Sequence, residues 1–120
     1  MALTLQDILN TEIKQLLVDL DFKLTSPRIH CMDGTSFSVQ ASNFTYCTPR
    51  SNRGPYSEVE LGYPSRHFLA LEQYKDADDE TAQVDSVFGY VPIEIVEAII
   101  KKCGGICEEL TLLNKDYVSN

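Results

Sequence analysis

An Asp-Gly pair at positions 33–34 separates two stretches that alternate apolar and polar residues, 28–32 and 36–42. A two-residue Asp-Gly turn matches the twist of two antiparallel strands, so this segment predicts a β-hairpin. Residues 44–47 are expected to continue the sheet. The hairpin therefore restricts the fold to one built around an antiparallel sheet.

Two further strands are expected downstream of the hairpin. Residues 56–63 alternate, with Val59, Leu61 and Tyr63 on one face and two glutamates on the other. Residues 87–91 are short and apolar, as in a last strand. The intervening residues 72–86 are rich in acids and are expected to form an exposed loop.

The N-terminal region, residues 1–21, predicts a helix. Residues 4–20 carry apolar side chains at intervals of three and four, and Thr4 with Asp7 resembles a capping box. The stripe consists of Leu5, Ile8, Leu9, Ile13, Leu16, Leu17 and Leu20. We expect this helix to cover one side of the sheet.

A second helix is expected at residues 92–105. Pro92 suits a first helical position, and Gly104-Gly105 is typical of a helix end. The tail 106–120 could form a short helix or pack on a neighbouring subunit. The predicted fold class is α+β: a single domain, residues 1–120, in which an antiparallel sheet over residues 22–91 is packed by the N-terminal and the C-terminal helix.

The composition bounds the class of protein. The chain has 120 residues and is 43% hydrophobic, which is enough for one core but leaves much surface, so self-association is expected. No apolar run is long enough for a transmembrane helix, and the first twenty residues lack the pattern of a signal peptide, so a cytoplasmic location is expected. A net charge of −8 argues against binding to a nucleic acid polymer or to a membrane surface.

All four arginines lie between residues 28 and 66, against the overall negative charge. Arg28 and Arg50 follow prolines in the similar tripeptides SPR and TPR, and Arg53 and Arg66 lie in the same turn-rich region. A guanidinium group matches a phosphate with two parallel hydrogen bonds. We therefore expect these arginines to bind a negatively charged ligand, with Arg28 and Arg50 as the first candidates for its phosphates and Arg53 and Arg66 as the second.

Aromatic residues accompany the arginines and offer faces on which a nucleobase could stack. We expect ligand stacking on Tyr46, Tyr56, Phe88 and Tyr90. Two alternatives without a ligand are consistent with the same residues. The arginines could pair with the excess acids, for instance Arg53 with Glu58, and the aromatic rings could fill the core.

Signatures of catalysis are sparse. The sequence contains no phosphate-binding loop, dinucleotide-binding glycine motif or nucleophile elbow, and the four cysteines lack the spacing of a zinc site. We expect no enzyme activity, no cofactor and no metal. A phosphodiesterase that uses His30 or His67 is a weaker alternative.

Residues 28–106 resemble a family of phage-encoded proteins. The segments that carry the resemblance are MDGTSFSVQAS, YCTPR, GPYSEVELGYPS, VFGYVP and KKCGGI. On these segments the chain is similar to Thoeris anti-defence protein 1. Residues 1–27 and 107–120 lie outside the resemblance.

The resemblance implies a function without catalysis. Members of this family sequester cyclic ADP-ribose derivatives made by bacterial TIR proteins, and some relatives bind cyclic oligonucleotides. They assemble as homo-oligomers, which predicts a dimer or a larger assembly up to a hexamer, in the host bacterial cytoplasm. The competing hypothesis is an acidic inhibitor that binds a protein, such as an anti-CRISPR DNA mimic, through the run DADDE at 76–80.

Overall fold

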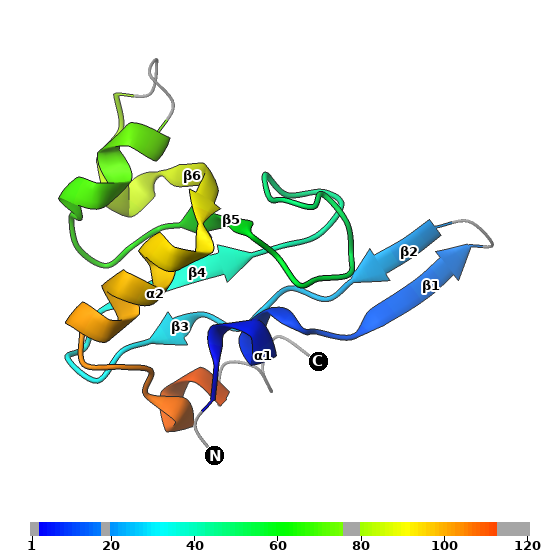
Figure 1. The fold of residues 1–120 in the computed structure, drawn as a ribbon, viewed down its shortest axis with the longest axis horizontal. Helices are drawn as coiled ribbons and strands as arrows, with labels where there is room; N and C mark the ends of the chain where they lie inside the picture. Colours follow the sequence, from blue (N-terminus) through cyan, green and yellow to red (C-terminus); the bar gives the residue numbers. More distant parts are fainter. Residues whose placement is uncertain (1–2, 18–19, 76–79, 113–120) are drawn as a thin grey trace.

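The protein is an α+β structure in a computed structural model that describes residues 3–17, 20–75 and 80–112 (Figure 1). A four-stranded antiparallel sheet has the order β3-β4-β5-β6, and a separate two-stranded hairpin, β1-β2, extends away from it. The strands of the sheet are Ile29–His30, Ser36–Gln40, Glu58–Gly62 and Val87–Pro92. Those of the hairpin are Ile13–Leu17 and Leu20–Lys23.

The turn at residues 33–34 joins β3 to β4 as expected. Gly34 has a φ of 95°, a conformation that glycine adopts at low cost, and the Asp33 carboxylate accepts a hydrogen bond from the Thr35 nitrogen at 2.9 Å. Ile29 pairs with Phe37 across the hairpin. The strands expected at 28–32, 36–42, 56–63 and 87–91 are confirmed; the first three are shorter than expected, and the last extends to Pro92.

Helix α2, Ile93–Lys102, crosses one face of the sheet (Figure 1). Pro92 lies just before the helix, not at its first position as expected, and Gly104 and Gly105, both at positive φ, follow its end as the sequence predicts. Its inward residues Val96 and Ile99 join the core. Residues 108–112 form a further helical turn, which lies along β3 because the Cys107 nitrogen donates to the His30 carbonyl at 2.6 Å.

The N-terminal helix is much shorter than predicted. Helix α1 is Leu5–Leu9, capped by the reciprocal hydrogen bonds of Thr4 and Asp7. Residues 13–17 form a strand instead of continuing the helix. Asn10 and Thr11 favour local hydrogen bonds over continuation of the helix. The backbone N–H and C=O groups that follow find their partners in β2 instead of within a longer helix.

The expectation of a strand at residues 44–47 is wrong. Side chains of Ser42 and Thr45 bind the backbone here: the Ser42 nitrogen donates to the Thr45 hydroxyl at 2.8 Å, and the Phe44 nitrogen to the Ser42 hydroxyl at 3.1 Å. Such local hydrogen bonds compete with sheet pairing. The chain therefore turns and enters the loop at residues 48–57, which contains cis peptides before Pro49 and Pro55.

The acidic region is more structured than expected where it is described. Short 3-10 helices span Leu69–Tyr74 (η1) and Gln83–Asp85 (η2). The buried Gln83 amide bonds both the nitrogen and the carbonyl of Phe68, at 2.7 and 2.8 Å. Residues 76–79, the centre of the expected acidic loop, lie outside the described residues.

The core lies between the sheet and α2, with α1 packed at one end. Its largest fully buried side chains include Phe37, Phe88, Leu61 and Leu71. Phe88 is 0% exposed, so its ring offers no face to a ligand, and its proposed stacking role is not supported by its position. The Phe88 side chain points inward from β6 and packs in the core.

A pair of phenylalanine substitutions tests this assignment of the core. Phe88→Ala should lower the free energy of unfolding by about 3–5 kcal/mol, since it leaves a large cavity. Phe44→Ala, at a side chain that is 65% exposed, should change it by less than about 0.5 kcal/mol. Urea denaturation measures both, and equal losses would contradict the placement of Phe88.

Candidate functional site

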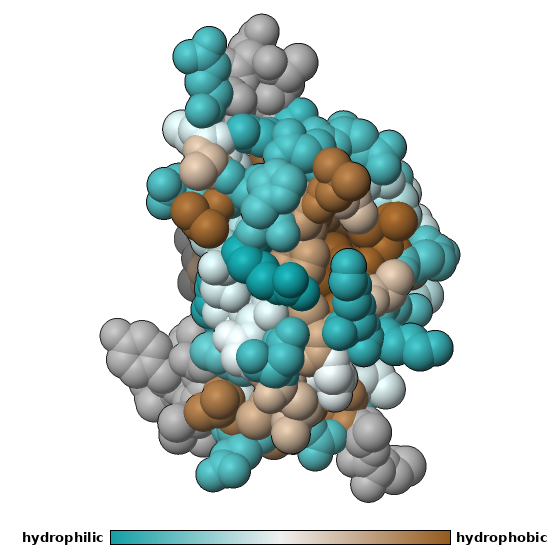
Figure 2. Space-filling model, turned by 90° about the vertical axis from the view of Figure 1, so that its left-hand side faces the viewer, coloured by the Kyte–Doolittle hydropathy of each residue, from teal (hydrophilic) through white to brown (hydrophobic). Residues whose placement is uncertain are grey.

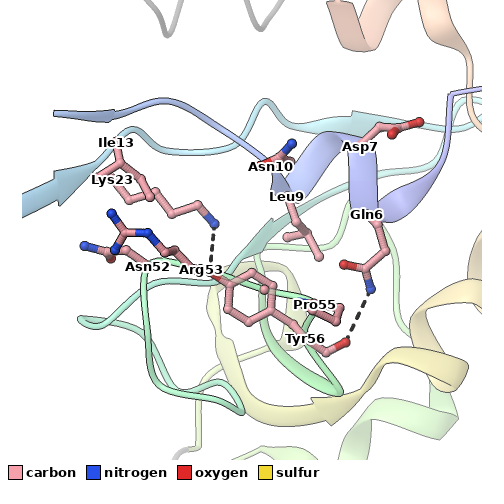
Figure 3. Close-up of a pocket in the computed structure, with 11 residues that line it drawn as sticks. Gln6, Asp7, Leu9, Asn10, Ile13, Lys23, Asn52, Arg53, Pro55 and Tyr56 are labelled. Carbon is pink, nitrogen blue, oxygen red and sulfur yellow. Dashed lines mark hydrogen bonds between the residues drawn. The ribbon is translucent and has the colours of Figure 1, made fainter.

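A pocket of about 360 Å³ lies between α1, the base of the β1-β2 hairpin and the loop at residues 48–57 (Figure 3). Its volume is in the range of small-molecule sites. Three segments distant in the sequence contribute to it, so the pocket forms only in the folded chain. The lining residues are Gln6, Asp7, Leu9, Asn10, Ile13, Lys23, Asn52, Arg53, Gly54, Pro55 and Tyr56.

Helix α1 is tied to the loop on the opposite wall of the pocket. The Gln6 amide donates to the Tyr56 carbonyl at 3.3 Å, as Figure 3 shows. Leu9 is buried beneath. Asp7 is held by Thr4, whose backbone N–H is the main reason that the pKa of this carboxyl is lowered. The capping box therefore also fixes one wall of the pocket.

Tyr56 forms the base of the pocket and is only 4% exposed. Its hydroxyl donates to the Ser51 carbonyl at 2.8 Å. Gly54 permits the close approach of the loop, because a Cβ at this position would lie 3.0 Å from the Tyr56 ring. Burial raises the pKa of the Tyr56 phenol, so it stays protonated and can donate at neutral pH.

Lys23 extends along the pocket with its nitrogen toward Tyr56 (Figure 3). Its Nζ donates to the Ala41 carbonyl at 2.5 Å and to the Tyr56 hydroxyl at 3.2 Å, and lies 4.7 Å from the centre of the Tyr56 ring. The residue is 7% exposed. Burial lowers the pKa of Lys23 to about 8, because the charged form is poorly solvated.

Arg53 lies at the outer edge of the pocket. It pairs with Asp21 of β2 at 3.4 Å, not with Glu58 as one alternative proposed. The Asn52 side chain supports this edge, since its oxygen accepts from the Asn43 nitrogen at 3.0 Å and its nitrogen donates to the Asp21 carbonyl at 3.4 Å. Arg53 is well exposed, so a ligand anion can compete for its donors.

The pocket thus combines two cations, a phenol and amide groups, with a single carboxylate, Asp7, in its lining. Such a set can bind an anion that carries a planar or ribose-like polar group. Within residues 3–17, 20–75 and 80–112, no three His, Cys, Asp or Glu side chains gather to bind a metal. The same ranges contain no helix long and apolar enough to cross a membrane.

Arg28 lies elsewhere and is used by the fold. Its guanidinium donates to the Ser36 hydroxyl at 3.0 Å, the Ser36 carbonyl at 3.2 Å and the Tyr63 carbonyl at 2.5 Å. Burial lowers the pKa of Arg28. These hydrogen bonds connect Arg28, just before β3, to Ser36 of β4 and to Tyr63. Part of its N–H donors is therefore already used within the fold.

Arg50 forms a separate group with two tyrosines on the surface. Its guanidinium lies 5.5 Å from the centre of the Tyr46 ring, and the Tyr46 and Tyr90 rings are 5.8 Å apart with a 36° tilt. The rings are 52% and 45% exposed. Gly89 lets Tyr46 approach β6, because a Cβ at Gly89 would lie 3.1 Å from the Tyr46 Cβ.

Arg66 lies at a fourth place, in a groove of about 470 Å³ between η1 and α2. It is held by Thr35 at 3.2 Å and Cys103 at 3.3 Å, and stacks on Phe68 at 4.5 Å. Apolar side chains gather at the centre of the face shown in Figure 2, with hydrophilic ones around them. The groove itself is lined by Arg66, His67, Phe68, Leu69, Ala70, Ile95, Ala98, Ile99 and Lys102.

The two histidines have different surroundings. His67 contacts Glu72 at 3.0 Å, and the His30 backbone bonds Thr111 and Cys107 in the C-terminal segment. Burial and, to a lesser extent, the nearby Arg28 charge lower the pKa of His30.

The structure therefore divides the predicted site residues among four places and the core. It brings Arg53 and Tyr56 together, and Arg50, Tyr46 and Tyr90 together. Sequence reasoning missed Lys23. The sequence of β2 did not indicate that Lys23 is buried. Phe22 is half-exposed and Lys23 is buried, which is the reverse of what their hydropathy predicts.

Comparison with protein-family models, with curated proteins and with solved structures finds no match to this chain.

The buried lysine predicts a pH-dependent stability. Its pKa is near 10.5 when unfolded and about 8 when folded, so the unfolded chain binds more protons between these values and stability rises with pH across them. Lys23→Met abolishes this contribution. The stability of Lys23→Met relative to the wild type should therefore fall by on the order of 2 kcal/mol between pH 7 and pH 10.

Urea denaturation at the two pH values measures this difference. Lys14→Met, at an exposed lysine of the same hairpin, is the matched control and should show no such change. If the two variants respond alike to pH, the ammonium of Lys23 is not desolvated by folding.

Proposed function

We propose that the protein binds an anionic, nucleotide-like small molecule in the pocket lined by Lys23, Arg53 and Tyr56, and holds it without chemical change. The observation that carries the proposal is the concave grouping of two cations around a buried phenol in a chain of net charge −8. Arg53 offers paired donors to a phosphate. Asn10 is exposed in the same lining and can bind a ribose or base edge.

The particular ligand class that we propose is a cyclic nucleotide immune signal, a cyclic ADP-ribose isomer or a related cyclic oligonucleotide. This step rests on the resemblance of residues 28–106 to the Thoeris anti-defence family. The protein would then act in the cytoplasm of a bacterium infected by a phage. It would block TIR-dependent immunity by sequestering the signal. Catalysis is not needed, because removing the signal is sufficient.

Self-association is part of the proposal. Large apolar side chains lie on the surface, among them Met32 at 66% and Leu69 at 83% exposure. Such residues favour contact with a second copy when they are close together. Light scattering at micromolar concentration should give a dimer or a larger assembly, and a monomer mass of 13.5 kDa would contradict this part.

The competing function is that of an acidic inhibitor that binds a protein. Its key residues, Asp76, Asp78 and Asp79, lie outside the described residues, and Glu80 is exposed. No described contact favours this function over the pocket. It remains the alternative outcome of the experiment below.

Ligand binding is tested by calorimetry with cyclic ADP-ribose isomers on three variants. Arg53→Ala should weaken binding roughly ten- to a hundredfold, because a charge-assisted hydrogen bond contributes about 1.5–3 kcal/mol. Arg50→Ala is the matched control, an exposed arginine of the same loop that lies outside the pocket lining. Neutralising Asp76, Asp78, Asp79 and Glu80 together should leave affinity nearly unchanged, because none of the four belongs to the pocket lining.

Each outcome has a distinct meaning. If Arg50→Ala weakens binding and Arg53→Ala does not, the ligand binds on the Tyr46–Tyr90 surface. If no isomer binds the wild type, while the loop variant loses protection in a TIR-based defence assay, the acidic inhibitor is the better account.

A further inference from the structure

We propose that Lys23 is a nucleophilic amine that captures an aldehyde on an anionic ligand entering the pocket, forming an imine. The inference goes beyond noncovalent binding, and it does not depend on the identity of the natural ligand. It rests on the position of the amine, on its hydrogen bonds and on the cavity that it faces.

The hydrogen bonds of Lys23 suit a neutral amine. A neutral amine has two N–H groups and one lone pair, and Nζ has two acceptors, the Ala41 carbonyl and the Tyr56 hydroxyl. Tyr56 in turn donates its own hydrogen to Ser51, so its oxygen is oriented to accept. With both N–H groups engaged, the remaining position on the nitrogen is the lone pair, which is the nucleophile.

Burial of Nζ favours loss of its proton, and the Cys47 side chain opposes this to a smaller extent. The other ionisable side chains of the pocket are Asp7 from α1 and Arg53 and Tyr56 from the loop. Among the described residues, none of the carboxylates forms an ion pair with Lys23. Desolvation therefore dominates and lowers the pKa of Lys23 to about 8, so that a substantial fraction is neutral near physiological pH.

The pocket supplies the other requirements of imine formation. Arg53 lies at the edge of the same cavity and can bind the anionic group of an incoming aldehyde, which positions the carbonyl near the amine. The Tyr56 hydroxyl contacts Nζ and can relay a proton. No residue outside the pocket is needed.

The reaction balances with the aldehyde as the only co-reactant. The Nζ lone pair attacks the carbonyl carbon, and one amine proton passes to the carbonyl oxygen, giving a carbinolamine. Its hydroxyl then leaves with the second amine proton as water, and the imine remains. The step is reversible by hydrolysis, so capture is stable only while the ligand stays bound.

Pyridoxal 5′-phosphate, an aromatic aldehyde with a phosphate, is a suitable probe. The full chain is incubated with a limiting amount at pH 7.5, reduced with borohydride, digested and mapped by mass spectrometry. We expect labelling of Lys23 to exceed that of the exposed Lys14 by roughly tenfold or more, since burial lowers the pKa of Lys23 and leaves more of its amine neutral at this pH. The rate at Lys23 should rise with pH and level off above about 8.

Two variants separate reactivity from simple exposure. Lys23→Arg should remove the dominant label, while Lys14→Arg should leave it. Labelling spread evenly over the lysines, or a rate at Lys23 that keeps rising up to pH 10, would overturn the proposal. The wild-type labelling map distinguishes these outcomes even if Lys23→Arg fails to fold, and it is independent of whether any cyclic nucleotide binds.

Discussion

The pairing of Thr48 with Glu58 closes the loop at residues 48–57, and both clusters of predicted ligand residues depend on it. The Thr48 nitrogen donates to the Glu58 carbonyl at 3.0 Å, the Ser57 nitrogen to the Thr48 carbonyl at 2.8 Å, and the Thr48 hydroxyl to the Glu58 carboxylate at 2.6 Å. β5 begins at this point, so the loop is anchored to the sheet. Arg53 then faces the pocket, and Arg50 lies with Tyr46 beside β6.

Lys23 gives the pocket its chemical character. A buried amine costs stability when protonated, and the fold keeps it by supplying the Ala41 carbonyl and the Tyr56 hydroxyl as acceptors. Hydrophobic packing of the hairpin base would not require a lysine here. An anionic ligand would restore a counterion to the ammonium, and an aldehyde would instead react with the amine, so binding and reactivity have a common physical origin.

The sequence predicted most of the sheet and the C-terminal helix, because turn and cap signals there agree with the apolar pattern. Asp33-Gly34, Pro92 and Gly104-Gly105 each act through local backbone geometry. It did not predict the β1-β2 hairpin, since the apolar spacing of residues 13–20 fits a helix equally well and only pairing with β2 decides between them. The hydrogen bonds of Arg28 within the fold could not be predicted, because its partner Tyr63 is distant in sequence, and Lys23 was missed because its burial depends on Tyr56.

The central claim is that the pocket holds an anionic nucleotide intact. The most direct measurement is to incubate the protein with the cyclic ADP-ribose product of a TIR protein, remove the excess by gel filtration, denature the protein and analyse the released small molecule. We expect release of unaltered ligand from the wild type and much less from Arg53→Ala. Release of a hydrolysed product, or equal retention by both proteins, would contradict the claim.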